Sequence, residues 1–452
     1  MATTRLYNTS GTATGATKYT LSMWIKRSKL SSEMNLIGVS SGNTIELIKF
    51  NANDKLYWYN RDAASNAAEN YTSNVFRDTS GWYHLVFSYD STESSAANQR
   101  KIYINGVNQT WASAAAVQSN AVPGMNLSGA VRNIGAESTP SNYFNGLMTQ
   151  VIFIDGTVYT PSTFGSINAT SGIWVGNTSP TVTYGNNGFN LDMANSSDMG
   201  NDVSGNANDF TVGGTLTQIK DCPDNNFATL NALATSSYAT LIQGNNTVKG
   251  NISTNSAETF STLSTNNDGK YYYEIKCTVV NGVDNPNFGF IQTARGFRLQ
   301  NGEPGLGGAT SGSLDIRVQP DGKLFENGAA SGSAVISTYT DGDILGFAID
   351  SDNGAFYVSK NGVWQTSGNP ESGASRTGAI KTWSPTDSKV TDGQSVCIGV
   401  YNTAAIADAN FGNGYFGTTA VASAGTNASG NGIFEYDVPT GYTALSTKGL
   451  NL

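Results

Sequence analysis

The feature that most constrains the fold is a recurring pattern of short β-rich runs, each ended by Gly, Asn or Asp. In the run HLVFSYD, Leu85, Phe87 and Tyr89 occupy every second position, as in a strand with one face in a core. The run VIFID from Val151 is apolar on both faces, which is typical of a strand between two layers. Helical periodicity is almost absent, so strands dominate the expected structure.

Tight turns follow several of these runs. The dipeptides that indicate them are Asn105-Gly106, Asp155-Gly156, Asp321-Gly322 and Asn361-Gly362. Asn-Gly and Asp-Gly readily adopt the positive φ angles of two-residue hairpin loops. Many antiparallel strands joined by such turns predict an all-β fold of the sandwich or jelly-roll type.

The chain is too long for one ordinary core, with 452 residues. Strand patterning stops in the segment QIKDCPDNNFATLNAL, which contains a proline and adjacent acids, and resumes on both sides of it. We therefore predict two antiparallel β-sandwich domains in tandem. They span residues 1–215 and 234–452, with a connector over 216–233.

Charge and cysteine content narrow the classes of function. Charged residues make up 13% of the chain, against about a quarter in typical domains. The net charge is −9 and no Lys/Arg cluster occurs, so we expect no nucleic-acid partner. No apolar run is long enough to insert into a membrane, and no leader sequence is evident. The odd number of cysteines, Cys222, Cys277 and Cys397, predicts free thiols in a protein made in a cytosol.

The first half resembles a laminin-G-like, concanavalin A-type jelly roll. The matching segments are YTLSMWIKRS from Tyr19, GWYHLVFSYD from Gly81, KIYINGV from Lys101 and IGAESTPSNYFNGLMTQVIFIDG from Ile134. The resemblance implies that Trp24, Trp82 and His84 lie on strands. It also implies that the run GNDVSGNANDFTV from Gly200 supplies the closing strand.

The second half resembles a SPRY (B30.2-like) domain. The matching segments are GKYYYEIKC from Gly269, FGFI from Phe288, GDILGFAIDSDNGAFYVSKNGVW over 342–364, and CIGVYN with ANFGNGYF up to Phe416. The run over 342–364 is the most specific, since it gives a strand, an acidic turn, a second strand and a Lys-Asn-Gly turn in the family's order. Domains of this type bind through variable loops at one end, so no site residue carries over.

The tandem, with its Asn-, Gly-, Ser- and Thr-rich style, resembles virion structural proteins of marine tailed phages. The resemblance implies a non-enzymatic virion surface protein, a tail-fibre or tail-associated subunit assembled in the host cytoplasm. Its expected partners are other virion subunits, further copies of itself as a homo-oligomer or repeated array, and a host surface glycan. The rival interpretation is a capsid-decorating or tail-stabilising subunit that makes only protein contacts.

A carbohydrate-active enzyme is a third, disfavoured interpretation. Glucanases of the concanavalin A type need paired carboxylates at a sugar cleft, and the E-x-D-x-x-E spacing does not occur. Glu33, Glu46 and Asp54 are expected among turns and strand ends. The acids Asp155, Asp192 and Asp350 each lie within a few residues of Gly or Asn and are typical turn carboxylates. We expect no catalytic residue.

The sequence also gives no support for a metal or cofactor site. His84 is the only histidine, so a multi-His metal site is excluded, and its alternation in HLVFSYD indicates a strand residue at a sheet face. Oxygen-rich loops such as SSDMGND from Ser196 leave Ca²⁺ possible. No specific motif supports it, and we predict no cofactor and no metal ligand.

Aromatic side chains near loop tips, with amides and carboxylates at their edges, are the candidates for sugar contact. In YWYNR, Tyr57 and Tyr59 share one face of a strand and Trp58 takes the other, so one set belongs to the core. Tyr143 follows a Ser-Asn pair in a second such segment. Trp383 and Tyr401 are the candidates in the second domain.

Overall fold

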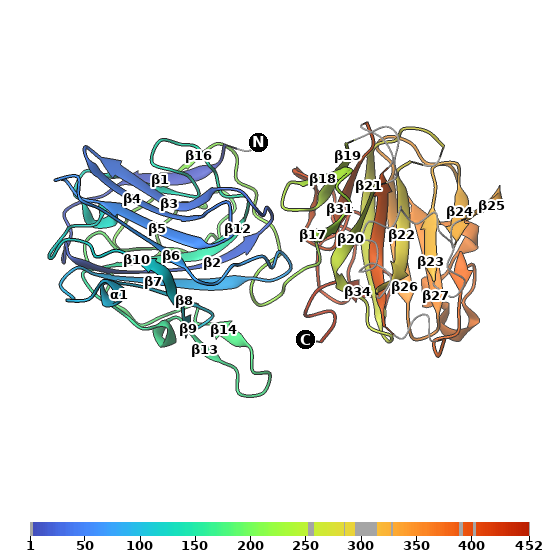
Figure 1. Ribbon diagram of the computed structural model, residues 1–452. Coiled ribbons are helices and arrows are strands. Elements are labelled where there is room, and N and C mark those ends of the chain that lie inside the picture. The colour runs from blue at the N-terminus through green and yellow to red at the C-terminus, as the bar shows by residue number, and fades with distance from the viewer. Residues whose placement is uncertain are drawn as a thin grey trace. The chain divides into compact units, whose positions relative to one another are not determined.

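The chain forms two compact units, Met1–Gln218 and Ile219–Leu452. The computed structural model describes residues 3–251, 257–283, 285–293, 314–326, 329–387, 392–400 and 404–451. Both units are built mainly from antiparallel sheets (Figure 1), and the all-β sandwich prediction is confirmed. The α-helix that lies wholly within the described residues is α1 (Ala96–Gln99). No helix in this part of the chain is long and apolar enough to cross a membrane.

The first unit consists of two large sheets and one small hairpin. The first sheet has the order β10 (Trp111–Ala114), β6 (Ala67–Thr72), β5 (Leu56–Arg61), β4 (Thr44–Phe50), β3 (Met34–Ser41), β11 (Val131–Ile134), β1 (Arg5–Thr9) and β16 (Thr211–Gly213). The second has the order β15 (Phe189–Leu191), β12 (Gly146–Asp155), β2 (Lys18–Arg27), β7 (Tyr83–Asp90), β8 (Arg100–Ile104) and β9 (Val107–Asn108). The hairpin joins β13 (Gly165–Ile167) to β14 (Trp174–Gly176), and the 3₁₀ turns are η1 (Gly124–Asn126) and η2 (Pro161–Thr163).

Strand alternation places the core of this unit between its two large sheets. The inward residues Leu85, Phe87 and Tyr89 of β7 join one apolar cluster with Trp58 of β5. Ile152 and Ile154 of β12 are also buried, because the segment containing Phe164 packs on their outer side. The prediction of a two-sided strand at VIFID is confirmed. Strand β16 pairs with β1 and closes the sheet, as the run from Gly200 indicates.

Three of the four turn dipeptides lie in hairpins. Asn105 and Gly106 both have positive φ and join β8 to β9. Asn361-Gly362 joins β27 (Ala355–Lys360) to β28 (Val363–Trp364) in the same way. Asp321-Gly322 joins β23 (Asp315–Val318) to β24 (Lys323–Glu326). Asp155-Gly156 is different: it ends β12 but leads to η2, and a Cβ on Gly156 would lie 2.9 Å from the backbone nitrogen of Gly15. That turn is set by close backbone packing and not by strand pairing.

The described part of the second unit also pairs two large sheets. The first has the order β17 (Leu230–Thr235), β20 (Ala257–Ser264), β30 (Gln394–Val400), β22 (Asn287–Gln292), β23 (Asp315–Val318), β24 (Lys323–Glu326) and β25 (Ala329–Ala334). The second runs β18 (Ala239–Ile242), β19 (Thr247–Gly250), β31 (Ile406–Asn410), β21 (Lys270–Val279), β26 (Ile344–Asp350), β27 (Ala355–Lys360) and β28 (Val363–Trp364). Strands β29 (Lys381–Thr382) and β34 (Thr443–Ala444) pair with β27 and β21, and β32 (Tyr415–Phe416) with β33 (Thr419–Ala420). The 3₁₀ turns are η4 (Gln365–Ser367) and η5 (Pro370–Ser375).

The segment expected as a connector, 216–233, differs from that expectation. Phe227, Ala228 and Leu230 are buried in the apolar clusters of the second unit, and β17 begins at Leu230. The segment lacks alternation because its buried residues are consecutive. The division between the units lies earlier, between Gln218 and Ile219.

Candidate functional site

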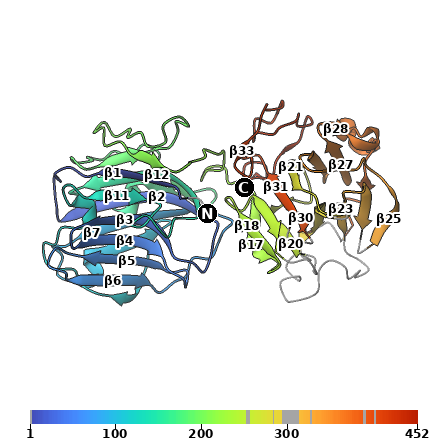
Figure 2. The same ribbon diagram turned by 90° about the horizontal axis from the view of Figure 1, so that it is seen from above.

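Three neighbouring strands of the first unit present tyrosine rings on the outer face of the first sheet. Strands β4, β5 and β6 lie side by side (Figure 2). Lys49, Tyr57 and Tyr71 are aligned across them in one row, and Tyr59 is opposite Glu69 in the next. We call these five residues the tyrosine surface.

The two rings of β5 form its centre. Tyr57 and Tyr59 are parallel within 6°, with ring centroids 6.5 Å apart, and both are partly exposed. The Tyr57 hydroxyl donates a hydrogen bond of 2.6 Å to Oε2 of Glu69, and Lys49 Nζ lies 5.2 Å from the Tyr57 ring centroid. Burial and the contact with Glu69 raise the pKa of Tyr57. Tyr57 therefore stays a neutral hydrogen-bond donor at physiological pH.

The opposite face of β5 belongs to the core. Trp58 is fully buried and donates its indole N–H to Oε1 of Glu46 at 3.0 Å. The same oxygen accepts from the Tyr19 hydroxyl at 2.5 Å, and Oε2 accepts from the backbone N–H of Met125 at 2.9 Å. Glu46 therefore lies inside the sandwich, in mid-strand, and not at a turn or strand end as expected. A carboxylate held there does not reach the surface.

Tyr143 lies at the border of the same sheet face. It forms a parallel bridge with Asn35 of β3, which is opposite Lys49 of β4. Its hydroxyl donates to the carbonyl of Pro140 at 3.2 Å. Two strands, β3 and β4, therefore lie between Tyr143 and the stacked rings of β5, so Tyr143 is next to the same sheet but is not part of the tyrosine surface.

The two candidates of the second unit do not join a site. Trp383 is 8% exposed and packs edge-on against Phe290, with centroids 5.4 Å apart, so its assignment to an exposed loop tip is wrong. Its backbone N–H donates to the carbonyl of Gly354, and a side chain at Gly354 would meet Trp383. That close packing draws the ring into the core. Tyr401 lies outside the described residues.

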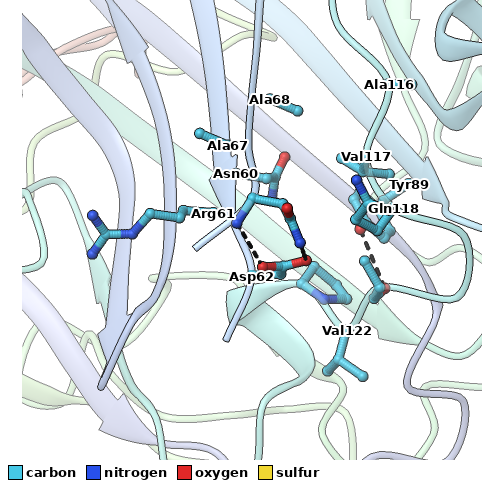
Figure 3. Close-up of a pocket in the computed structure, with 13 residues that line it drawn as sticks. Asn60, Arg61, Asp62, Ala67, Ala68, Tyr89, Ala116, Val117, Gln118 and Val122 are labelled. Carbon is cyan, nitrogen blue, oxygen red and sulfur yellow. Dashed lines mark hydrogen bonds between the residues drawn. The ribbon is translucent and has the colours of Figure 1, made fainter. Parts of the chain in front are cut away.

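A pocket opens at the end of the first unit, where the loop between β5 and β6 meets the segment 116–123 (Figure 3). Its cavity volume is about 20 Å³, room for about one water molecule. Arg61 and Ala67, at the ends of β5 and β6, line it together with the buried Asn60. Sequence reasoning missed this pocket, because its walls come from segments about 50 residues apart.

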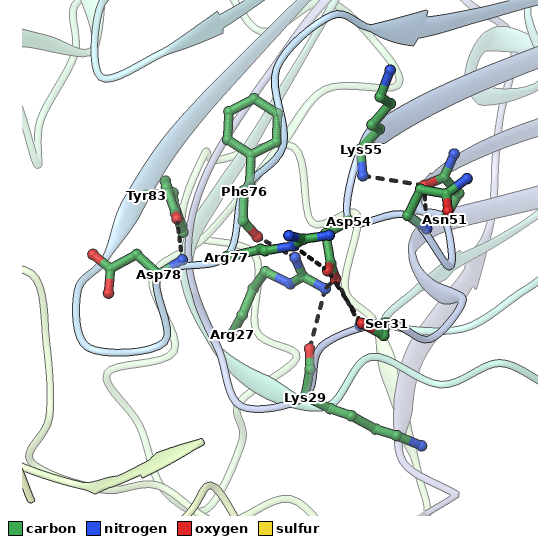
Figure 4. Close-up of polar contacts among 11 residues, drawn as sticks. Arg27, Lys29, Ser31, Asn51, Asp54, Lys55, Phe76, Arg77, Asp78 and Tyr83 are labelled. Carbon is green, nitrogen blue, oxygen red and sulfur yellow. Dashed lines mark hydrogen bonds and ion pairs between the residues drawn. The ribbon is translucent and has the colours of Figure 1, made fainter. Parts of the chain in front are cut away.

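A buried ion cluster fixes the loop after β4 (Figure 4). Asp54 Oδ1 lies 2.9 Å from Arg27 Nη2, and both side chains are fully buried. Arg77 Nε lies 3.0 Å from Oδ2, and the backbone N–H of Ser31 donates to Oδ1 at 2.7 Å. Burial alone would raise the pKa of Asp54, but these donors outweigh it and the pKa is lowered. Asp54 is a structural anion.

The other acids expected at turns act as caps. Asp155 accepts from the backbone N–H groups of Thr14 and Gly15, Asp192 from that of Ala194, and Asp350 from that of Asn353. Both oxygens of Asp202, in the loop considered for Ca²⁺, accept hydrogen bonds from the protein. Among the described residues, no three His, Cys, Asp or Glu side chains gather as metal ligands would.

His84 lies on a sheet face, as predicted, and is buried there. Its ring stacks between Trp24 and Trp174, at centroid distances of 4.7 and 5.8 Å. Nδ1 accepts from the Trp174 indole at 3.0 Å, so Nε2 carries the proton and donates to Ser22 Oγ at 2.8 Å. Burial lowers the pKa of His84 to about 3. The ring is a neutral packing element.

Comparison with known proteins agrees with the fold of the first unit. Residues 3–161 match the family model of the concanavalin A-like lectin/glucanases superfamily. This part of the chain therefore has a concanavalin A-like fold, of the type that binds carbohydrate or protein. No curated protein matches the chain.

Solved structures are similar at low identity. The SPRY domain of human HERC1 is 12% identical with a TM-score of 0.30, over 40% of this chain and 96% of its own. The SAP-like pentraxin from Limulus polyphemus is 14% identical with a TM-score of 0.29, over 39% of this chain and 87% of its own. Domains LG4-5 of the mouse laminin alpha1 chain are 7% identical with a TM-score of 0.29, over 88% of this chain and 78% of their own.

Proposed function

We propose that this protein binds glycans through the tyrosine surface, as a non-enzymatic component of a phage particle that contributes to host recognition. The observation that carries the proposal is the pair of parallel, partly exposed rings of Tyr57 and Tyr59. Lys49 Nζ lies over the Tyr57 ring, and Glu69 accepts a hydrogen bond from the Tyr57 hydroxyl.

The chemistry of the surface suits a sugar. A sugar ring has apolar C–H faces that pack on an aromatic ring and hydroxyl groups that hydrogen-bond at its rim. Glu69 supplies acceptors and Lys49 supplies donors beside the rings. The rings are stacked on each other through their own packing, so the surface is preorganised and loses little side-chain freedom on binding.

The position on a tail or particle surface rests on the resemblance of the tandem to virion proteins. A flat polar surface binds a single glycan weakly, and repeated copies on a particle raise avidity without any new contact. A homo-oligomeric or repeated presentation follows from this reasoning.

The lack of catalysis is part of the proposal. Glu46 has both oxygens engaged inside the sandwich, and Glu69 accepts from Tyr57 on the outer face. Hydrolysis of a glycosidic bond uses two carboxyl groups that flank that bond. Purified protein should release no reducing sugar from a glycan that it binds.

A second candidate function is purely structural, with contacts only to other subunits. The observation that favours it is the exposed apolar set on the β13–β14 hairpin, where Ile167, Ile173 and Val175 are 66%, 55% and 37% exposed. Contiguous exposed apolar side chains mark protein contact sites.

The experiment is a glycan array probed with the full chain, the Tyr59→Ala variant and the Tyr238→Ala control. Tyr238 is a 39% exposed tyrosine of the second unit. We expect Tyr59→Ala to weaken binding about tenfold, since a stacked ring contributes roughly 1 to 1.5 kcal/mol. The control should bind as the natural chain does. Failure of the natural chain to bind any glycan would favour the structural candidate.

A further inference from the structure

The hairpin of β13 and β14 extends as an arm from the outer face of the second sheet (Figure 1). We call residues 165–177 the arm. Trp174 attaches it to the sheet, because its ring stacks on the buried ring of His84. On β7, His84 precedes Leu85, which belongs to the core, so alternation places His84 and the arm on the side of the sheet away from the core.

Four apolar side chains around Trp174 are exposed to solvent. Ile173 and Val175 flank Trp174, so alternation directs them to the opposite face of the hairpin, away from the sheet. They are 55% and 37% exposed. Ile167, directly opposite Trp174 in the hairpin, is 66% exposed, and Val107, which follows the glycine under the Trp174 ring, is 64% exposed. We call Val107, Ile167, Ile173 and Val175 the apolar patch.

The arm also lies in an uncharged part of the chain. Between Asp155 and Asp192 the sequence contains no Asp, Glu, Lys or Arg, although charged residues make up 13% of the whole chain. The net charge is −9, and a net charge of one sign opposes the association of two copies. A contact made through the arm brings no like charges together, and the burial of apolar area favours it.

These properties fit a second copy of this chain better than a charged partner. An acidic or basic partner finds no charge of opposite sign on the arm. In a twofold contact the same residues meet from both sides. An uncharged apolar patch is complementary to itself, because apolar side chains pack together without directional partners.

We propose that two copies of this chain associate arm to arm about a twofold axis and bury the apolar patch between them. The tyrosine surface lies on the outer face of the first sheet and the arm on the outer face of the second, so both tyrosine surfaces of the pair stay accessible. Two such surfaces in one assembly raise avidity for a repeating glycan. The proposal goes beyond the proposed function, because the association holds whether or not the tyrosine surface binds sugar.

The size of the arm sets the strength of the association. A stable interface uses about 20 to 30 residues on each side, and the arm together with Val107 provides fewer. We therefore expect a reversible dimer with a Kd on the order of 10 µM. Sedimentation velocity of the full chain should show monomer at about 1 µM and mostly dimer at about 100 µM.

The test variants place a charge in the contact. Ile173→Asp and Ile173→Lys each bring two like charges together in the pair, so each variant alone should raise the Kd at least about tenfold. An equal mixture of the two should recover the dimer, because opposite charges then meet. The matched control is Val131→Asp, since Val131 is 42% exposed on β11 of the first sheet. It should dimerise as the natural chain does.

Four results would overturn the proposal. The first is a natural chain that is monomeric at both concentrations. The second is a dimer that Ile173→Asp leaves intact, since the copies would then meet elsewhere. The third is a dimer lost in both Ile173 variants and not recovered in their mixture, which would assign the arm to a different surface of the second copy. The fourth is sedimentation of the natural chain, but not of Ile173→Asp, with phosphatidylcholine vesicles, which would assign the patch to lipid. No glycan enters these measurements, so their failure leaves the proposed sugar site standing.

Discussion

Trp174 donates its indole N–H to Nδ1 of His84 at 3.0 Å, and the two rings stack within 21° of parallel. This contact attaches the β13–β14 hairpin to β7 of the second sheet. It also fixes the neutral tautomer of the single histidine, because a protonated ring has no acceptor nitrogen for Trp174.

The first prediction is a loss of stability in mild acid that depends on His84. Burial lowers the pKa of His84 to about 3 in the folded state, against about 6.5 when unfolded. The unfolded chain therefore binds the proton first, and the stabilisation, present above pH 6.5, is lost as the pH falls toward 3. We expect the free energy of unfolding to fall by about 4 kcal/mol as the pH drops from 6.5 toward 3. In urea titrations, the free energy of unfolding should change less with pH for His84→Gln than for the natural chain. An equal change in both proteins would contradict the lowered pKa of His84.

The second prediction concerns the space beneath Trp174. A Cβ on Gly106 would lie 2.3 Å from the Trp174 ring, whereas one on Gly42, which also has positive φ, would meet nothing within 4 Å. Gly106→Ala should displace Trp174 and so release the β13–β14 hairpin. It should lower the free energy of unfolding by about 1 to 3 kcal/mol more than Gly42→Ala does. Limited proteolysis should cut Gly106→Ala within residues 168–173 faster than the control. Identical cleavage of both variants would show that Trp174 does not hold the hairpin.

The third prediction concerns the buried ion pair. Asp54→Asn leaves the fully buried Arg27 without its counter-ion and should lower the free energy of unfolding by about 3 to 5 kcal/mol. Glu33→Gln removes a surface partner of Lys49, where the Glu33 side chain is 45% exposed, and should cost under about 1 kcal/mol. Denaturant titration of both variants measures the difference. Costs of similar size would contradict the structural role of Asp54.

The fourth prediction concerns the thiols, all three of which are free in the structure. Cys277 and Cys397 are buried, and burial raises the pKa of each, while Cys222 is half-buried. Since the thiolate is the reactive form, iodoacetamide should label Cys222 first in the native protein. All three should be labelled in denaturant without reductant, as mass spectrometry will show. A protected pair in denaturant would reveal a disulfide.

The sequence was sufficient for features set by local alternation. Tyr57 and Tyr59 are outside and Trp58 is inside because side chains alternate along β5. Features that depend on partners distant in the sequence could not be predicted. Arg100 binds Asn60 and Asn70 from strands 30 to 40 residues away, and no local sequence pattern predicts that contact.

For Trp383 the local structure was predicted correctly, but the exposure of the side chain was not. Its neighbours Ser384 and Pro385 indicate a loop, which is correct, yet the ring is buried because the loop packs on Gly354. Local composition identifies a loop but does not say which of its side chains are exposed. Tyr143 was chosen as a candidate because it lies in a polar segment of the sequence. Its position beside β3 depends on a bridge to Asn35, 108 residues away, which the sequence does not predict.

The central claim is that the tyrosine surface binds sugar, and the most direct measurement is a crystal structure of the full chain with the glycan that binds it most tightly on the array. We expect a sugar ring against the face of Tyr59 or Tyr57, with hydroxyls within hydrogen-bond distance of Glu69 or Lys49. A glycan held elsewhere on the chain, with Tyr57 and Tyr59 free of contact, would contradict the account.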